Sequence, residues 1–434
     1  MKLYRYSVIV LIILLLTACQ PTPAPTLPAP TSTPAPTPTV TVLPSPTPTL
    51  GPCPDGVTTL LLWHTYTGAQ WDVIEGMIET YNATNDACIR LEYAYVEGVG
   101  RALARAIPAG DGPDLVAWEG AQIGAAALAG TLAPLDAYLG SDFMEDTFVL
   151  PAARGMMWDG HVWGLPETMS GIALVYNRAM LPDEDLPDPD DFADLLAKAT
   201  DFHDANNHLH YLCSPGLSTE VDATYAAPVY LGFGMPGVVG EDGRLYLDTQ
   251  AALAAGEWIA AFSRVSPVEA SAEQCREMMR NGEVAAWWTG PESMAGLTED
   301  GVYHDIAPLG RPLVETRAWM LTANAVERGN AEAAVAAMTW WTSQAVLTER
   351  VLRTGEIPAN AAALANRDVQ SDYVISGFGE ALSRGVPVPN TPYADAVWGP
   401  LGDATAAIWS GAQTPAEALA AAQAAATAAI AEMK

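Results

Sequence analysis

The chain has 434 residues, of which 51 are acidic and 20 are basic, so its formal net charge is −31. This balance argues against nucleic acid as a partner, because binding to phosphate backbones needs clustered Lys and Arg, and against direct binding to an anionic membrane surface. Half of the residues are hydrophobic, which is enough for substantial cores, and the length favours two lobes or domains over one core.

The first 18 residues have the form of an export signal. Lys2 and Arg5 precede an uninterrupted apolar run over residues 8–16. This run is shorter than the roughly 20 apolar residues of a spanning helix and suits the apolar region of a signal peptide. We therefore predict a signal peptide over residues 1–18, with a short membrane anchor as the alternative.

Residues 19–56 are predicted to form a tether. Between residues 20 and 54 the chain holds 13 of its 34 prolines, many threonines and no charged residue, so this segment cannot bury a core. Repeated proline favours extended, polyproline-like chain, which at about 3.1 Å per residue reaches on the order of 100 Å. The function is therefore expected in the residues that follow.

Strands and helices alternate in the next part of the chain. In order, the patterns predict a strand at 57–63, a helix at 71–81, a strand at 89–96, a helix at 102–107, a strand at 114–118 and a helix at 121–129. Such alternation is typical of an α/β lobe with a mostly parallel sheet.

The same kinds of element continue to the end of the chain. Strands are predicted at 162–166, 172–176, 209–213, 284–289, 305–309 and 318–322, and helices at 190–200, 224–231, 249–262, 273–281, 330–347 and 415–433. Thr414 is predicted to cap the last helix, with Pro415 at its first position.

Four cysteines follow Cys19, and an even number in an exported protein indicates disulfides, although four cysteines permit three pairings. Cys53 and Cys88 each precede a strand of the first βαβ unit, so parallel pairing of these strands brings the two close. Cys213 and Cys275 are then left as the second pair. The spacings do not fit a C-x₂-C zinc site.

Several motifs together resemble those of the extracellular solute-binding proteins of the maltose-binding type. They lie in order at 62–68 (LWHTYTG), 110–118 (GDGPDLVAW), 130–136 (GTLAPLD), 159–166 (DGHVWGLP), 173–177 (ALVYN), 281–291 (NGEVAAWWTGP), 387–390 (PVPN) and 411–419 (GAQTPAEAL). In front of them, residues 16–19 (LTAC) resemble the bacterial lipobox, in which the cysteine becomes the lipidated first residue.

The resemblance implies an α/β fold of the two-lobed, type II periplasmic-binding kind, with a ligand cleft between lobes that are joined by several crossovers. It implies an N-lobe of residues 57–166 plus 305–345 and a C-lobe of residues 167–304 plus 346–434. Cys19 is the implied lipidation site. The protein is then exported and anchored to the outer face of the cytoplasmic membrane.

The aromatic composition fits a carbohydrate ligand. The chain has 13 Trp and 15 Tyr but only 7 Phe, and Trp and Tyr combine an apolar face with a polar edge, as a pyranose does. With the resemblance, this predicts ligand-binding roles for His64, Thr67, Trp118, Glu119, Glu167, Tyr225, Trp288, Glu292, Arg317, Trp319, Tyr393 and Trp398. Ser170 stands where maltodextrin binders have a carboxylate.

The function implied is that of a monomeric binding protein, not an enzyme, that delivers a sugar or oligosaccharide to the permease of an ABC transporter. No cofactor or metal is expected. A polyamine or other small cationic solute is the main alternative ligand, given the candidate carboxylates and the affinity of Trp for cations. A secreted glycosidase is a further alternative, and His203, Asp204, His208 and His210 are weighed as a metal site but fit a polar loop better.

Overall fold

The computed structural model describes residues 53, 56–206, 209–218, 220–267 and 269–433. The predicted signal peptide, the lipidation site Cys19, most of the predicted tether and His208 lie outside these residues. Among the helices that the structure describes, none is both long and apolar enough to span a bilayer.

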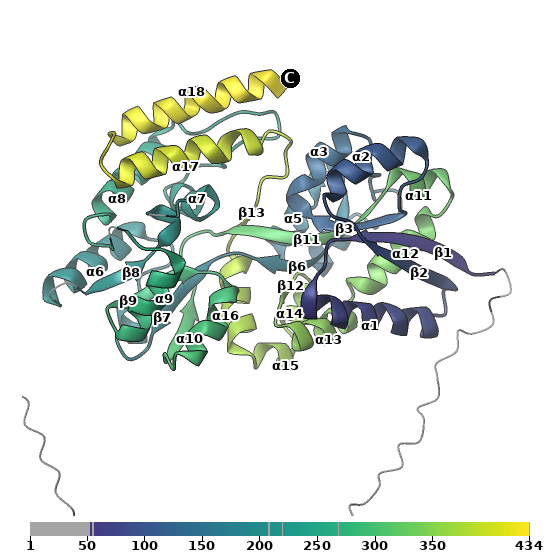
Figure 1. The fold of residues 1–434 in the computed structure, drawn as a ribbon, viewed down its shortest axis with the longest axis horizontal. Coiled ribbons are helices and arrows are strands. Elements are labelled where there is room, and N and C mark those ends of the chain that lie inside the picture. Colours follow the sequence, from purple (N-terminus) through teal and green to yellow (C-terminus); the bar gives the residue numbers. More distant parts are fainter. Residues whose placement is uncertain (1–52, 54–55, 207–208, 219, 268, 434) are drawn as a thin grey trace, which may run out of the picture. The chain divides into compact units, whose positions relative to one another are not determined.

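A seven-stranded mixed sheet combines strands from the first part of the chain with strands that follow residue 312 (Figure 1). Its order is β12-β6-β11-β3-β1-β2, and β13 also pairs with β11. The strands are β1 (Thr58–His64), β2 (Ile89–Tyr95), β3 (Leu115–Glu119), β6 (Gly164–Ser170), β11 (Leu313–Leu321), β12 (Ile357–Pro358) and β13 (Val386–Pro387). Because β1 runs parallel to both β2 and β3, the carboxyl ends of these three strands meet at one edge of the sheet.

A second, four-stranded sheet has the order β10-β7-β9-β8. Its strands are β7 (Ala173–Asn177), β8 (His210–Cys213), β9 (Val284–Thr289) and β10 (His304–Ala307), and a separate hairpin joins β4 (Met157–Trp158) to β5 (His161–Val162). Only two residues separate β6 of the first sheet from β7 of the second, so the chain crosses directly from one sheet to the other.

Helices cover both sheets. The helices that precede β7 are α1 (Gly68–Thr84), α2 (Val99–Ala109), α3 (Ile123–Leu128), α4 (Phe143–Thr147) and α5 (Leu150–Gly155). Those between β7 and β11 are α6 (Phe192–Ala205), α7 (Ala223–Gly232), α8 (Gln250–Phe262), α9 (Ala272–Asn281) and α10 (Met294–Glu299). Those after β11 are α11 (Ala323–Glu327), α12 (Ala331–Trp341), α13 (Gln344–Thr354), α14 (Ala361–Leu364), α15 (Arg367–Gln370), α16 (Tyr373–Ser383), α17 (Asp395–Trp409) and α18 (Pro415–Met433).

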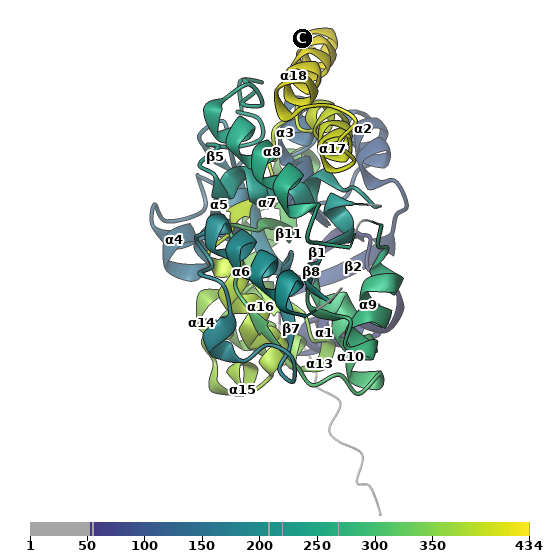
Figure 2. The ribbon, with the colours of Figure 1, turned by 90° about the vertical axis from the view of Figure 1, so that its left-hand side faces the viewer.

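Two clusters of buried side chains form the cores. One lies on the first sheet and continues onto the face of the second sheet that carries Trp287. The other includes Trp288, on the opposite face of β9, and extends to α7, α8, α17 and α18. Figure 2 shows α17 and α18 near α7 and α8, so the chain's last helices pack with elements from its middle.

The disulfides and the last helix cap agree with the sequence analysis. Cys53 is joined to Cys88, and Cys213 is joined to Cys275. Thr414 accepts a hydrogen bond from the backbone N–H of Glu417, whose carboxylate accepts one from the backbone N–H of Thr414. This reciprocal arrangement is a capping box, which fixes the start of α18.

The expected boundaries between the lobes need two changes. The strand predicted at 305–309 was assigned to the first lobe, but β10 pairs with β7 in the second sheet. The stretch after residue 345 was assigned to the second lobe, but α13 packs against α1 and β12 pairs with β6. The helix predicted at 330–347 is also divided, because Ser343 interrupts it between α12 and α13.

Candidate functional site

Two adjoining cavities form a groove along the segments that join the sheets. The cavity on the side of the first sheet has a volume of about 230 Å³ and is lined by Gln70, Glu119, Thr168, Met169, Ser170, Glu315, Thr316, Arg317 and Glu356. The cavity on the side of the second sheet has a volume of about 70 Å³ and is lined by Ser170, Gly171, Ile172, Thr224, Tyr225, Gly290, Glu292, Leu313 and Glu315. Ser170 and Glu315 line both cavities, and they face each other in the pairing of β6 with β11.

The sheet register places an ion pair in the groove. Arg317 of β11 lies opposite Glu119 at the carboxyl end of β3, and its Nη2 lies 3.2 Å from Oε1 of Glu119. The same guanidinium donates to the hydroxyl of Thr65 and lies over the ring of Tyr66, 4.8 Å from its centroid. Arg317 is therefore held from three sides while its side chain stays 19% exposed.

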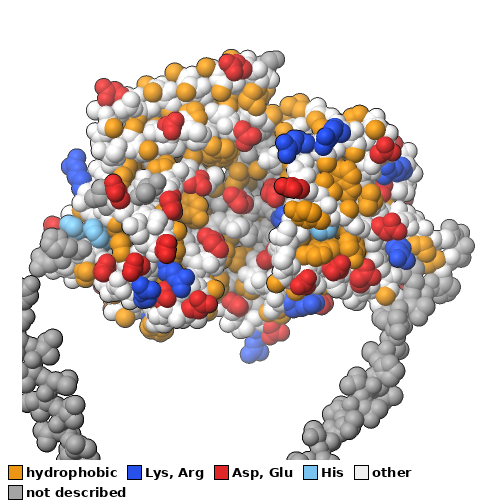
Figure 3. Space-filling view, in the orientation of Figure 1, with side chains coloured by type: hydrophobic (Ala, Val, Ile, Leu, Met, Phe, Trp, Pro, Cys, Tyr) orange, Lys and Arg blue, Asp and Glu red, His pale blue; other side chains and the backbone are white. Residues whose placement is uncertain are grey.

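The other end of the groove combines an aromatic ring with carboxylates. Tyr225 lies in the first turn of α7 and is half-buried, and Glu292 follows β9 in the turn that begins at Gly290. None of the ion pairs in the described part of the chain involves Glu292 or Glu315. Many acidic side chains and few basic ones mark the face shown in Figure 3.

These groups affect one another's protonation. Burial raises the pKa of Tyr225 to about 12, and the carboxylates of Glu292, Asp222 and Glu315 act in the same direction. The pKa of Glu315 is raised by its partial removal from water and then by the charges of Asp222, Glu119 and Glu292. Like charges at short range disfavour ionisation, so this end of the groove favours a ligand that donates hydrogen bonds to carboxylates.

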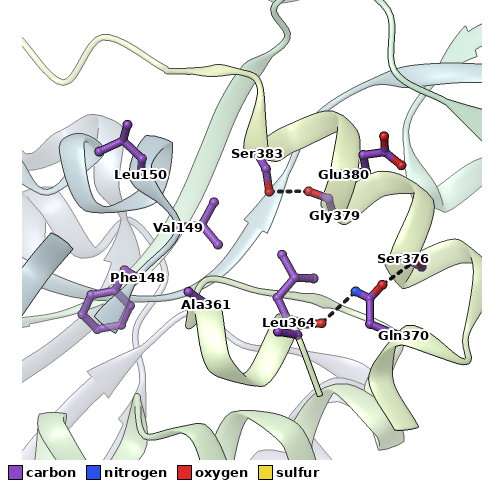
Figure 4. Close-up of a pocket in the computed structure, with 11 residues that line it drawn as sticks. Phe148, Val149, Leu150, Ala361, Leu364, Gln370, Ser376, Gly379, Glu380 and Ser383 are labelled. Carbon is purple, nitrogen blue, oxygen red and sulfur yellow. Dashed lines mark hydrogen bonds between the residues drawn. The ribbon is translucent and has the colours of Figure 1, made fainter. Parts of the chain in front are cut away.

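A larger cavity of about 700 Å³ lies elsewhere, between α5, α14 and α16 (Figure 4). Apart from the exposed Glu380, its polar side chains are engaged with neighbours: Ser383 donates to the carbonyl of Gly379, Gln370 donates to that of Leu364, and Ser376 donates to Gln370. The remaining walls are mostly apolar and no aromatic face other than Phe148 contributes. The groove is the better candidate site of the two, because it combines the carboxylates of Glu292 and Glu315, a guanidinium and a tyrosine.

Comparison with known proteins identifies the family. The family model described as "Bacterial extracellular solute-binding protein" matches residues 76–374. The chain belongs to this family. A maltotriose-binding protein from Pyrococcus abyssi is 26% identical over 358 residues, which cover 79% of this chain and 76% of that protein. Membership in the family implies that this solute-binding protein is exported.

Solved structures share the fold of this solute-binding protein. A cyclo/maltodextrin-binding protein complexed with maltotetraose has a TM-score of 0.73 at 23% identity, covering 88% of this chain and 100% of that one. A Staphylococcus aureus extracellular solute-binding protein in complex with maltose has a TM-score of 0.74 at 20% identity, covering 87% and 99%. These similarities confirm the predicted α/β, two-lobed solute-binding fold.

Two residues predicted to bind the ligand of this solute-binding protein lie inside the protein instead. Glu167 is 0% exposed and accepts hydrogen bonds from Tyr66, Trp341 and Arg350. Trp319 is also 0% exposed, and its Nε1 donates to the hydroxyl of Tyr66. The structure therefore places both side chains in the core and not in the groove. The pairing of β6 with β11 shifts register between Arg317 and Ala318 and skips Glu167, so strand alternation counted from the groove residues does not place either side chain.

Trp288 is a third correction. Trp288 was predicted to bind the ligand in the cleft. Strand alternation does send Trp287 and Trp288 to opposite faces, but both are buried, at 3% and 0% exposure. Both faces of the second sheet are covered, so alternation along β9 does not expose either ring.

The other predicted residues divide between the groove and its surroundings. Glu119, Tyr225, Glu292 and Arg317 line the groove. The remaining five do not: His64 is buried, Thr67 is exposed at the start of α1, and Trp118, Tyr393 and Trp398 are half-buried against the cores.

His64 has a distinct environment. Its ring stacks on Trp71 with 3.9 Å between the ring centroids. Burial and then the positive charge of Arg317 lower the pKa of His64 to about 4. A neutral, stacked imidazole is suited to packing beneath the groove rather than to binding a ligand.

Sequence reasoning missed most of the other lining residues, among them Gln70, Glu315 and Glu356. Glu315 carried a usable signal, because it is a charged residue within the otherwise mostly apolar start of β11. Gln70 and Glu356 carried none, since their position depends on the approach of α1 to the turn after α13, which are 286 residues apart.

The described residues contain no group of three or more His, Cys, Asp or Glu side chains that could hold a metal ion. His203 and His210 stack with their ring centroids 5.5 Å apart, while His208, the third histidine of that stretch, lies outside the described residues.

Proposed function

We propose that this protein is the extracellular substrate-binding lipoprotein of an ABC importer and that it binds a sugar or oligosaccharide in the groove. The observation that carries the proposal is the set of groups lining one groove: the ring of Tyr225, the carboxylates Glu119, Glu292 and Glu315, and the guanidinium of Arg317. The printed names of the relatives, which bind maltose, maltotriose or maltotetraose, support the same ligand class.

The chemistry of the groove suits a pyranose. Sugar hydroxyls donate to carboxylates and accept from a guanidinium, and such charge-assisted hydrogen bonds are stronger than neutral ones. A tyrosine ring offers an apolar face to the C–H groups of the sugar and keeps a polar edge. Micromolar affinity, about −8 kcal/mol, is within reach of a few such contacts.

Binding is proposed to be coupled to closure of two lobes. With the sheet pairings taken into account, the first lobe comprises residues 57–170 and 313–364, and the second is built on the sheet of β7, β8, β9 and β10 with α17 and α18. The segment between β6 and β7 and the start of β11 line the groove and also join the lobes. A solute that touches both sides favours the closed form only through its added contacts.

Cys19 is proposed to carry the lipid anchor, on the outer face of the cytoplasmic membrane, with residues 20–56 as the tether. A single acyl chain binds a membrane only marginally, so a diacylated cysteine is the more stable anchor. The protein then acts as a monomer that delivers its solute to the permease subunits. Labelling with a lipid precursor tests this, and loss of the label in Cys19→Ala is expected.

A thermal-shift screen of the purified protein tests the ligand class. The panel contains maltose, maltotriose, maltotetraose and spermidine. A ligand at 100 times its Kd stabilises the folded state by about 2.7 kcal/mol. We expect stabilisation by at least one sugar, whereas a response to no sugar contradicts the proposal.

A cationic solute is the second candidate, because Glu292 and Glu315 have no ion-pair partner among the described residues and could receive an ammonium group. Stabilisation by spermidine alone in the same screen would select it. Binding rather than hydrolysis is proposed, since a glycosidase needs two carboxyl groups placed across the scissile bond. Unchanged maltotetraose after prolonged incubation is the expected result.

A further inference from the structure

A buried cluster of charged and aromatic side chains lies beneath the groove. Glu167 and Arg350 are both fully buried, and Nη1 of Arg350 donates to Oε2 of Glu167. The hydroxyl of Tyr66 donates to the same carboxylate at 2.8 Å, and the indole of Trp341 donates to it as well. A buried pair of this kind offsets its desolvation only when its remaining polar atoms are also bonded, as they are here.

Arg350 extends the cluster to one groove residue. Its Nε and Nη2 each donate to Glu356 at 2.8 Å, so the two side chains form a bidentate pair. Thr354 also donates to Glu356, at 2.8 Å. The amide nitrogen of Gln70 donates to the same carboxylate. The carboxylate of Glu356 is thereby saturated, and it fixes Gln70 with its amide nitrogen inward, which leaves the amide oxygen as the acceptor for a solute.

Tyr66 extends the cluster to a second groove residue. Its hydroxyl is fixed by Glu167 and by the indole N–H of Trp319, at 2.9 Å. Its ring lies under the guanidinium of Arg317, 4.8 Å from centroid to carbon. The position of Arg317 therefore depends on the position of the ring, because a guanidinium over an aromatic face is held by the ring's quadrupole.

We propose that Glu167 and Arg350 are positioning residues for solute binding, which orient Arg317 through the ring of Tyr66 and Gln70 through the carboxylate of Glu356. This proposal rests on the proposed function, since it assumes that the groove binds the solute. Neither Glu167 nor Arg350 touches the solute. They affect affinity indirectly, through Tyr66 and Glu356, each of which contacts the buried cluster and also a residue that lines the groove.

Removing one hydroxyl tests the proposal with little risk to folding. Tyr66→Phe deletes the group that Glu167 holds and keeps the ring. Tyr230→Phe is the matched control: Tyr230 is also fully buried, and its hydroxyl bonds to Thr405 in the other core. For maltotriose measured by calorimetric titration, we expect Kd to rise about tenfold in Tyr66→Phe and to stay unchanged in Tyr230→Phe, although both variants melt at lower temperature.

A double-mutant cycle separates positioning from stability. Glu167→Gln is expected to raise the Kd for maltotriose about tenfold in the native background but less than twofold in an Arg317→Met background. The reason is that Glu167 contacts Tyr66 and through it Arg317, whereas the path to Gln70 starts at Arg350. The loss of melting temperature should be the same in both backgrounds. Equal Kd values for wild type, Tyr66→Phe and Glu167→Gln overturn the proposal and leave the proposed function intact. Failure of the wild type to bind maltotriose or any other sugar of the panel overturns both.

Discussion

The two ends of the groove use the same residue type in opposite ways. On the side of the first sheet, Glu167 and Glu356 are held by Arg350; Glu167 and Arg350 are fully buried, and the side chain of Glu356 is 19% exposed. On the side of the second sheet, Glu292 and Glu315 line the groove with no ion-pair partner among the described residues. The role of a glutamate in this groove therefore depends on whether an arginine pairs with it. Glu167 and Glu356, which Arg350 holds, form the fixed floor of the groove, whereas Glu292 and Glu315 remain available to a ligand.

The largest expected effect comes from breaking the floor. Glu167→Ala leaves the guanidinium of Arg350 buried with half of its partners, and removal of one member of a buried pair costs about 3–5 kcal/mol. Urea-induced unfolding measures the change in the free energy of unfolding. Glu349→Ala, which breaks the exposed pair of Glu349 with Arg353, should cost at most about 1 kcal/mol. Similar losses of stability in both variants would show that the buried pair contributes no more to the free energy of unfolding than an exposed pair does.

The side of the second sheet is secured by a covalent link instead. The disulfide between Cys213 of β8 and Cys275 of α9 closes a loop with a sequence separation of 62 residues, and both cysteines are 0% exposed. Replacing both by alanine should lower the free energy of unfolding by about 2–4 kcal/mol. Replacing Cys53 and Cys88 by alanine, whose sequence separation is 35, should lower the free energy of unfolding by about 0.5 kcal/mol less, because the entropic stabilisation by a disulfide grows with the length of the loop that it closes. A larger loss of stability on removing the disulfide of the shorter loop, Cys53–Cys88, would contradict this prediction.

His64 is expected to make the stability of the protein depend on pH. Its pKa in the folded protein is about 4, below the 6.5 expected for the unfolded chain, so between these values only the unfolded state takes up the proton. Stability should therefore decrease as the pH falls from about 6.5 to about 4 and change no further from this group below that, a loss on the order of 2–3 kcal/mol. Unfolding midpoints in urea at pH 7 and pH 4 measure it.

His64→Phe provides the control for this prediction, because phenylalanine can keep the stacking on Trp71 but cannot bind a proton. The difference between the two pH values should shrink by the contribution of one titrating group. An identical difference in the variant would assign the pH dependence to other residues.

The smallest change in the free energy of unfolding is expected for Glu315, on the side of the second sheet. The pKa of Glu315 is raised by burial and neighbouring carboxylates, so its ionised form is disfavoured in the folded state and stability declines as the pH rises through its pKa. Glu315→Gln should therefore stabilise the unliganded protein at pH 7, by less than about 1 kcal/mol, and the gain should vanish at a pH where the carboxyl is protonated. Destabilisation at pH 7 would mean that Glu315 has a stabilising partner.

The sequence predicted the fold well because its signals are local. Alternating strands and helices, the pair Cys53–Cys88 and the cap at Thr414 all depend on neighbouring residues or on one βαβ unit, and Cys213–Cys275 was predicted as the pair that was left. The site was predicted less well. Glu119, Tyr225, Glu292 and Arg317 were found at strand ends and helix starts, whereas the partner that buries Glu167 lies 183 residues away in α13. Trp288 was misplaced because a strand's alternation does not say which of its faces are covered.

The groove, and not the larger cavity, is proposed to take up the solute. Calorimetric titration of the sugar that responds best in the thermal screen tests it with three proteins: the wild type, Arg317→Met in the groove, and Ser376→Trp, which fills part of the cavity between α14 and α16. We predict that Arg317→Met weakens binding at least tenfold, as loss of a charge-assisted contact requires, while Ser376→Trp binds as the wild type does. The reverse pattern, with binding lost in Ser376→Trp and kept in Arg317→Met, would mean that the larger cavity and not the groove takes up the solute.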